Sequence, residues 1–498
     1  MTASTPLLVT FAAYLLLMIG IGFWAWRSTR TFDDYILGGR SLGSYVTALA
    51  AGASDMSGWL LMGLPGALYL SGASETWIVF GLLAGAWANW RFVAGPLRVY
   101  TERTRNALTL PDYFTHRFED HGRLLRIFAG LVILVFFAIY CASGIVAGAR
   151  LFESVFGVPY VQALWWGAAV TIAYTFIGGF LAVSWTDTVQ ATLMLFALLL
   201  VPLVVVANLG GVGPSLALVK QVDPARLDWF KGGELSLIGI VSLLAWGLGY
   251  VGQPHILARF MAADSLATIP KARRISMTWM ALCLFGAIAV GFFGIAYYAA
   301  NPQLAGPVTD NAERVFIALS QQLFNPWVAG ILLSAILAAI MSTLSAQLLV
   351  CSSALSEDFY RGFLRPKAGQ RELVWVGRLM VLGVALLAIL IAHDPDSRVL
   401  GLVSYAWAGF GAAFGPVVVL SLVWQRMNRH GALAGMIVGA ATVILWKRYA
   451  GSDLYEIVPG VVAATLAIVA VSLLTRAPSA QVQATHQQVW QLLRENGY

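Results

Sequence analysis

Long apolar segments separated by short polar ones follow one another along almost the whole chain. About thirteen such segments can be delimited, each about 20 residues or longer. They cover approximately residues 6–26, 43–69, 74–97, 124–148, 161–180, 188–209, 235–257, 275–299, 327–355, 374–392, 399–424, 430–450 and 457–475. A helix needs about 20 residues to cross a bilayer, and the segments lack the alternation of membrane β-strands. The pattern predicts an all-α integral membrane protein with about 13 transmembrane helices.

Composition supports this prediction and excludes a soluble fold. Of the 498 residues, 59% are hydrophobic and 11% are charged, against about 45–50% and about 25% in ordinary soluble domains. A water-soluble domain of this size has too little interior to hide that much apolar surface, so the lipid bilayer must be the main solvent. No basic residue precedes the first segment and no cleavage pattern follows it, which predicts a retained helix rather than a signal peptide.

The net charge of +7 is distributed by loop and does not indicate nucleic-acid binding. Of the 31 basic residues, 22 fall in alternate polar segments. These segments are 27–41, 98–126, 258–274, 357–378, 425–431 and the tail after 475. Cytoplasmic loops carry such an excess, so we expect a cytoplasmic C-terminus and, with an odd number of spans, a periplasmic N-terminus. The polar tail 476–498 is expected to be flexible to about Ala484, with a short helix over 488–494.

The second apolar segment is interrupted by polar residues at mid-membrane depth. Asp55 is the only acidic or basic residue in the central third of any segment. A charge there costs about 2.5 to 3.5 kcal/mol, so it is expected to face a partner, a cavity or an ion. Ser54, Ser57 and Gly58 surround it, and these residue types favour departure from a helix. The segment predicts a broken helix.

The seventh apolar segment has a second interruption, over residues 246–255. Three glycines and one proline lie within it, and both residue types weaken a helix. Trp246, Tyr250 and Pro254 are spaced by four residues, which on an α-helix places them along one stripe and predicts an aromatic wall. Paired interruptions in corresponding segments are typical of transporters built from inverted repeats, whose binding site lies at the breaks.

A cluster of hydroxyl residues occupies the ninth segment. Ser342 and Ser345 share one helix face and Thr343 lies between them. Hydroxyl and carbonyl oxygens are hard ligands that suit a cation such as Na⁺. Taken alone, such residues also pack membrane helices together.

In combination these motifs resemble the sodium:solute symporter family. The motifs that carry the resemblance are Ser54 to Trp59, Trp246 to Pro254, Met341 to Ser345, Leu37 to Arg40, Gly178-Gly179 and Trp185 to Asp187. The resemblance covers residues 5–475 and implies a five-plus-five inverted-repeat transporter fold with broken helices 2 and 7. It implies one transmembrane domain, 1–475, followed by the cytoplasmic tail 476–498. Helices 2 to 6, about 43–209, and helices 7 to 11, about 235–424, would form the repeats, with helices 1, 12 and 13 outside them.

The same resemblance implies the binding residues. Sodium would be held by Ala53, Asp55, Met56, Ala339, Ser342 and Thr343. Substrate would contact Ser57, Gly58, Trp59, Tyr140, Trp246, Tyr250 and Pro254, and Asp187 would mark the ion exit path. Some family members bind a second sodium through two further serines and an aspartate like Asp187, but here Ala346 replaces the second of those serines. Two other interpretations stay open: Asp55 as a structural hydrogen-bonding group, and Asp187 as a solvated group at a helix end.

The expected function is sodium-coupled import of L-proline through a bacterial cytoplasmic membrane, with Na⁺ as coupling ion and no other cofactor. An aromatic wall suits a compact apolar ring, whereas a sugar site would need more amides and acids. The alternative is a symporter of the same family for another amino acid, a sugar or pantothenate. An enzyme or an ATP-driven pump is disfavoured because the chain has no HExxH, GxSxG or Walker A motif. A channel is disfavoured because channels do not usually need two broken helices.

Overall fold

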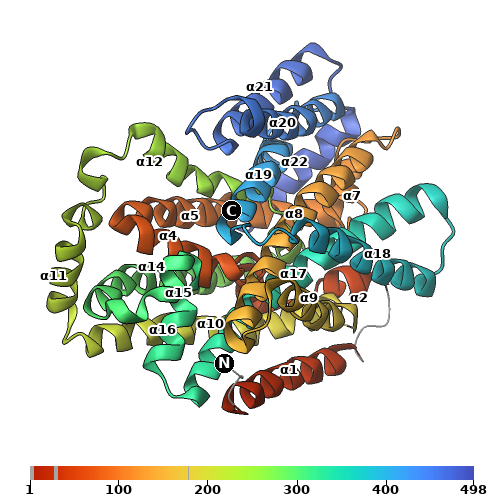
Figure 1. The fold of residues 1–498 in the computed structure, drawn as a ribbon. Coiled ribbons are helices and arrows are strands. Elements are labelled where there is room, and N and C mark those ends of the chain that lie inside the picture. Colours follow the sequence, from red (N-terminus) through yellow and green to blue (C-terminus); the bar gives the residue numbers. More distant parts are fainter. Residues whose placement is uncertain (1–4, 27–31, 178, 498) are drawn as a thin grey trace.

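A computed structural model describes residues 5–26, 32–177 and 179–497 of the chain. Within these ranges every regular element is a helix, and the only β-type contact is an isolated bridge between Leu42 and Ala263. The helices pack side by side around one continuous apolar core (Figure 1). The prediction of an all-α protein is confirmed.

Ten helices among the described residues are long and apolar enough to cross a membrane, or eleven if one bent pair forms a single span. One of the ten, Trp59–Arg103, has 45 residues, about 68 Å of helix and more than twice the hydrocarbon thickness. It divides at Gly72, whose φ of 77° suits glycine and ends α4 (Leu64–Ser71) before α5 (Thr76–Ala88) begins. If the two parts of Trp59–Arg103 count as separate spans and α9 (Tyr160–Ile177) is added, the number of spans among the described residues rises from eleven to thirteen. This number agrees with the apolar pattern of the sequence.

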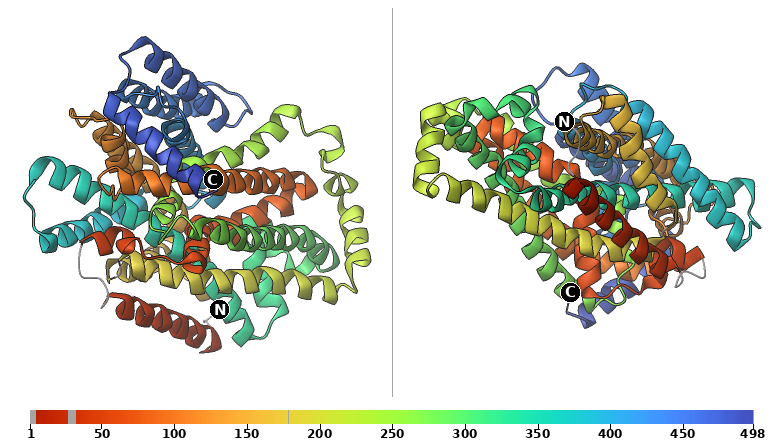
Figure 2. Two further views of the ribbon diagram at one scale, coloured as in Figure 1. Left: turned by 180° about the vertical axis from the view of Figure 1, so that it is seen from behind. Right: turned by 60° about the horizontal axis from the view of Figure 1, so that its bottom comes forward.

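Burial separates central from peripheral helices. In α17 (Pro326–Ser353) and α19 (Val399–Val423), 89% and 83% of the most apolar stretch is buried. The corresponding values are 28%, 33% and 28% for α1 (Thr5–Trp26), α20 (Arg429–Tyr449) and α21 (Ile457–Leu474). Figures 1 and 2 show α1 at one edge and the α20–α21 pair at the opposite edge. The three helices expected outside the repeats are therefore the least buried of these five.

Both predicted helix breaks are present. Helix α3 (Ser44–Asp55) ends at Asp55, and Met56 leaves the helical region with φ −81° and ψ 82°. The chain resumes at Trp59 with a π-helical turn, Trp59–Gly63, that leads into α4. Three residues therefore separate the two halves of this span, and the amides of Met56 and Ser57 still donate to the carbonyls of Gly52 and Asp55 at 3.0 Å each.

The second break lies between α12 (Leu237–Leu244) and α13 (Pro254–Met261). The connecting residues Ala245–Gly252 form a 3₁₀-helix, and the span bends by 45° at Gln253. Pro254 begins α13, where its missing N–H removes no helical hydrogen bond. The glycines and the proline thus act as predicted, although the glycine-rich part tightens rather than unwinds.

Two further long helices complete the surroundings of the breaks. Helix α8 (Leu124–Phe156) and helix α14 (Thr268–Ala300) each have 33 residues. Helix α8 packs against both α17 and α19, and α14 packs against α3 and α4. The broken spans are therefore enclosed on several sides by continuous helices, which fixes the position of the non-helical residues.

The C-terminal tail differs from the prediction. Instead of a flexible stretch to Ala484, the structure has helix α22 (Ala480–Glu495), whose N-cap Ser479 accepts a hydrogen bond from the Val482 amide. Val489 and Leu493 are buried against the membrane domain, and Trp490 Nε1 donates to the carbonyl of Leu422. Although the tail is polar overall, α22 has an apolar stripe, and this stripe packs against the membrane domain.

Docking of α22 is expected to weaken at acidic pH. Burial and the neighbouring Arg117 guanidinium lower the pKa of His486, which also contacts the Tyr100 hydroxyl, to about 4. An undocked histidine has a pKa of about 6.5, so the undocked helix binds the proton more readily. Docking should be fully stable above about pH 6.5 and lose stability as the pH falls toward about 4.

Hydrogen exchange of the α22 amides in the full chain, corrected for intrinsic rates, checks this expectation between pH 7.5 and pH 5. Protection should fall in the wild type and change less in His486→Phe, which cannot take up a proton. Equal protection at both pH values in the wild type would contradict the account.

Candidate functional site

The carbonyl of Ala53, in the last turn of α3, is the point where the first break meets α17. Ser342 Oγ donates to this oxygen at 2.9 Å and Thr343 Oγ1 donates to it at 3.2 Å. Ser342 Oγ also lies 3.1 Å from the carbonyl of Ala339, one turn earlier on α17. Four of the six residues expected to bind sodium thus form one buried oxygen cluster. Two carbonyls and two hydroxyls converge there, and hydroxyls accept as well as donate.

Asp55 lies two residues further on and is 2% exposed. Its Oδ2 accepts a hydrogen bond of 2.6 Å from the Tyr250 hydroxyl, which comes from the 3₁₀-helix of the second break. Its other oxygen, Oδ1, has no hydrogen-bond partner among the described residues. The carboxylate therefore connects the two broken spans and keeps one oxygen available for a cation.

A small cavity opens beside this carboxylate. Its volume is about 20 Å³, and its lining includes Asp55, Met56, Asn89, Tyr250 and Ser276. A water molecule needs about 10–15 Å³ of such space, so the cavity has room for little more than one water. An organic solute does not fit here, and this conformation is closed around the site.

The main chain of Asp55 gathers three of the residues expected to contact substrate. Its carbonyl accepts from Trp59 Nε1 at 3.0 Å and from the Tyr140 hydroxyl of α8 at 3.2 Å. The Ser57 amide donates to the same carbonyl at 3.0 Å. This one oxygen thus fixes the path of the break and orients two aromatic side chains toward it.

Gly58 permits a close approach between the break and α8. A Cβ atom at this position would lie 2.6 Å from Cβ of Ala147, closer than carbon atoms can pack. Any larger residue would push α8 away from the broken span. Gly58 therefore lies at the break, as expected, and the close packing against α8 requires a glycine at this position.

Trp246 and Pro254 do not join Tyr250 in one wall. A 3₁₀-helix has about 3 residues per turn, so residues four apart point in directions about 120° apart. The Trp246 ring packs 5.5 Å from the Tyr455 ring, whereas Tyr250 points toward Asp55. Pro254 lines a separate cavity of about 20 Å³ together with residues such as Leu37 and Val350. The expectation of a continuous stripe was wrong because it assumed α-helical spacing.

Asp187, on α10 (Phe180–Asn208), is fully buried rather than solvated. Arg259 of α13, equally buried, places its guanidinium 3.2 Å from Asp187 Oδ2. The second oxygen, Oδ1, has no partner among the described residues. The interpretation of Asp187 as a solvated helix-end group was therefore wrong, and a buried ion pair joins α10 to the second broken span.

Three polar residues near the breaks were missed as site residues. Asn89 Nδ2 donates to the Tyr250 carbonyl at 3.0 Å, and its Oδ1 lacks a partner among the described residues. Gln253 Nε2 donates to the Gly249 carbonyl, and Trp407 Nε1 donates to the Trp246 carbonyl at 2.7 Å. Asn89 is the only amide side chain in the segment 74–97, and that signal was available from the sequence.

Comparisons with known proteins agree with this architecture. A sequence profile of the sodium:solute symporter family matches residues 35–439. The sodium/proline symporter of Salmonella typhimurium is 69% identical over 483 residues, which cover 97% of this chain and 96% of that protein. The high-affinity proline transporter of Bacillus subtilis is 54% identical over 466 residues, which cover 93% of this chain and 97% of that protein.

A solved structure supports the fold. The substrate-bound, outward-open state of a Na⁺-coupled sialic acid symporter matches this chain with a TM-score of 0.81. The match covers 96% of this chain and 99% of the other at 20% sequence identity. At that identity the similarity concerns the fold alone, and the transporter fold predicted from the sequence is confirmed.

Proposed function

Because the chain belongs to the sodium:solute symporter family, we propose that it imports L-proline by coupling it to the inward movement of Na⁺. The membrane would be the cytoplasmic membrane of a bacterium. The observation that carries the sodium part is the convergence of the Ser342 and Thr343 hydroxyls on the Ala53 carbonyl at a helix break. The proline part rests on relatives named as proline transporters that match nearly the whole chain.

Sodium would bind among the oxygen atoms at the end of α3. The hydroxyls of Ser342 and Thr343 would turn their lone pairs to the ion beside the carbonyls of Ala53, Met56 and Ala339. Asp55 would balance the charge from nearby through the oxygen that lacks a partner. An oxygen set of this kind supplies hard ligands without thiols or imidazoles, as a hard monovalent cation requires.

Proline would bind on the opposite side of the break, beside Ser57, Gly58 and Trp59. Tyr140 and Tyr250 would border the site, because both hydroxyls hydrogen-bond to Asp55. Trp246 and Pro254 complete the proposed substrate set, and their present positions require the second broken span to move when substrate enters. The small volume at Asp55 supports a transport cycle in which the site opens alternately to the two sides.

The repeats are proposed to comprise helices 2 to 6, about 43–209, and helices 7 to 11, about 235–424. Asp187 and Arg259 would then connect the last helix of the first repeat to the first helix of the second. We propose that Na⁺ leaves past Asp187, whose unpaired oxygen offers a transient ligand. By the distribution of basic loops, the N-terminus is periplasmic and the C-terminus cytoplasmic.

The competing proposal is transport of another small solute by the same mechanism. Labelled L-proline uptake into proteoliposomes distinguishes the two when other amino acids, a sugar and pantothenate compete in excess. Only unlabelled proline and close analogues should suppress the signal. Absence of proline uptake under a sodium gradient would remove the proline assignment and leave the family membership unaffected.

Substitution of Tyr250 should weaken substrate binding more than substitution of Trp246. Tyr250→Ala removes a ring at the carboxylate and is expected to cost about 1 to 3 kcal/mol of proline affinity at saturating sodium. Trp246→Ala should reduce proline affinity less, because in this closed conformation the Trp246 ring packs on Tyr455 and not at the carboxylate. Equilibrium binding of labelled proline at saturating sodium measures both. Normal affinity in both variants would remove the main physical support for the proposed proline site.

The coupling ratio is expected to be one sodium ion per proline. Ala346 lies one turn beyond Ser342, is fully buried, and has no hydroxyl to offer a second ion. A reversal-potential measurement of proline flux in proteoliposomes gives the ratio directly. A value of two sodium ions per proline would show that other groups replace the missing hydroxyl.

A further inference from the structure

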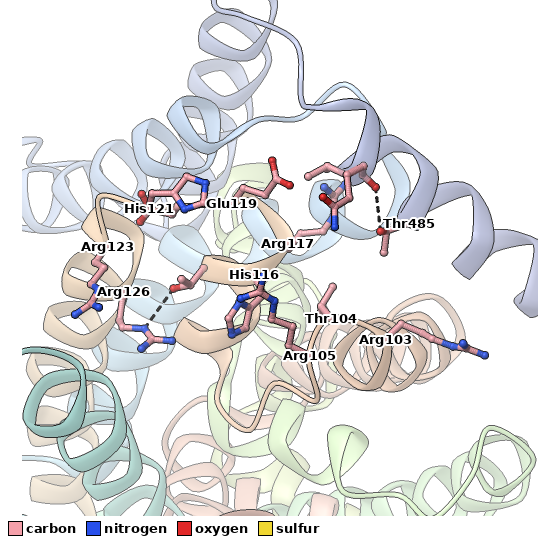
Figure 3. Close-up of a pocket in the computed structure, with 14 residues that line it drawn as sticks. Arg103, Thr104, Arg105, His116, Arg117, Glu119, His121, Arg123, Arg126 and Thr485 are labelled. Carbon is pink, nitrogen blue, oxygen red and sulfur yellow. Dashed lines mark hydrogen bonds between the residues drawn. The ribbon is translucent and has the colours of Figure 1, made fainter. Parts of the chain in front are cut away.

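A large basic cavity lies between the polar segment 103–126 and helix α22, away from both helix breaks (Figure 3). Its volume is about 570 Å³, within the usual range of about 300 to 1,000 Å³ for small-molecule sites. The first turns of α22 form one wall through Gln481, Val482 and Thr485. The N-terminal end of a helix carries partial positive charge, so this wall also favours an anion.

Positive charge predominates among the lining residues. The lining includes five arginines, Arg103, Arg105, Arg117, Arg123 and Arg126, and two carboxylates, Glu119 and Asp120. Only Arg126 among these arginines forms an ion pair within the described part of the chain, with Asp112 and Asp358. Asp120 Oδ2 accepts a hydrogen bond from the Leu125 amide. The two carboxylates offset only part of the charge of the five arginines, so the cavity keeps a net positive charge.

Arg117 distinguishes this cavity from an ordinary basic loop. Its side chain is 2% exposed, and Nε donates to the Ser421 carbonyl at 3.0 Å. Neither terminal nitrogen has a hydrogen-bond partner among the described residues. The guanidinium lies 5.4 Å from the centre of the Tyr100 ring and 5.1 Å from that of Phe118. A permanently charged group is thus buried beside two aromatic rings and the hydroxyls of Tyr100 and Tyr113, and it has no carboxylate partner among the described residues.

Membrane topology alone does not account for this arrangement. Basic residues that set the orientation of a membrane protein only need to lie on the cytoplasmic side, where water solvates them. A buried and unpaired guanidinium loses that solvation and is costly unless an anion compensates it. A phosphate group matches the planar fork of arginine in charge and geometry.

We propose that this cavity binds a phosphate group, carried either by a soluble phosphate ester or by the headgroup of an anionic phospholipid. Arg117 supplies positive charge at the buried end of the cavity, and Arg103 and Arg105 at the exposed rim attract the anion. The bound phosphate joins the segment 103–126 to α22, which also docks on α6 (Ala94–Arg103) and α19. The inference is independent of the transported solute.

The test uses the full chain in nanodiscs of neutral phosphatidylcholine, titrated calorimetrically with tripolyphosphate at constant ionic strength. Saturable binding is expected, weakened by about tenfold or more in Arg117→Gln. Because Arg117 is buried, the double variant Arg103→Gln with Arg105→Gln provides a second test at exposed positions. Arg371→Gln removes an exposed cytoplasmic arginine outside the cavity and should bind like the wild type.

A second arm uses nanodiscs that contain phosphatidylglycerol and native mass spectrometry to detect retained lipid. If the phosphate comes from lipid, phosphatidylglycerol should be retained by the wild type and by Arg371→Gln, and lost from Arg117→Gln and the double variant. Tripolyphosphate binding that is sensitive to the cavity arginines supports a soluble source. The proposal is overturned if neither probe distinguishes the cavity variants from Arg371→Gln.

Discussion

Asp55→Asn is expected to abolish sodium-coupled uptake while the protein still inserts and folds. Asparagine keeps the size of the side chain and still accepts the hydrogen bond from Tyr250, but it removes the negative charge next to the proposed ion. Breaking one partner out of a buried charge pair costs about 3 to 5 kcal/mol, so sodium affinity should fall by about two orders of magnitude or more. Sodium-dependent proline uptake and binding in the purified variant measure the effect.

The charge-retaining variant Asp55→Glu is the matched control and should keep part of the sodium affinity. If Asp55 is instead a structural hydrogen-bonding group, Asp55→Asn should be mild and should even stabilise the fold by removing a buried charge. Near-normal sodium affinity in Asp55→Asn would therefore exclude this residue from the ion site.

Loss of both hydroxyls in Ser342→Ala with Thr343→Ala should produce the second-largest effect. Two of the proposed ligands disappear together. At about 1 to 1.5 kcal/mol each, the loss is about 2 to 3 kcal/mol, so the sodium concentration for half-maximal transport should rise by about 30-fold to 150-fold. Expression should change little, because Ser342→Ala removes only the hydroxyl oxygen and Thr343→Ala removes only a hydroxyl and a methyl group. Transport measured against sodium concentration gives the shift.

Ser345→Ala supplies the matched control on the same helix. Its hydroxyl donates to the Ser342 carbonyl at 3.2 Å and makes no hydrogen bond to Ala53. Its removal should leave sodium dependence nearly unchanged. If the double variant and Ser345→Ala had the same sodium dependence, the oxygen cluster at Ala53 would not be the ion site.

Local sequence rules were sufficient for the parts of the fold that depend on local chemistry. The break at Met56 follows from an acidic residue, hydroxyls and a glycine at membrane depth, and these are intrinsic properties of the segment. The bend at Gln253 follows from glycines and Pro254. The thirteen spans follow from hydropathy alone, because the bilayer requires a continuous apolar length.

The features that were mispredicted depend on tertiary contacts or on helix type. The 3₁₀ geometry of Ala245–Gly252 changed which side chains share a face, and no residue spacing distinguishes it from an α-helix in advance. The Asp187–Arg259 pair joins positions 72 residues apart, a contact that one sequence does not reveal. Helix α22 depends on its docking partners, since a polar tail of this length has little tendency to fold alone.

Coupling of proline uptake to the sodium gradient can be measured directly with one set of imposed ion gradients. The purified chain is reconstituted in proteoliposomes, and labelled proline is followed under an imposed inward sodium gradient, with lithium, potassium or proton gradients of equal size as comparisons. The account predicts that the sodium gradient drives proline above its external concentration until that gradient dissipates, whereas potassium does not. Accumulation that is independent of sodium, or simple equilibration under every gradient, would contradict it.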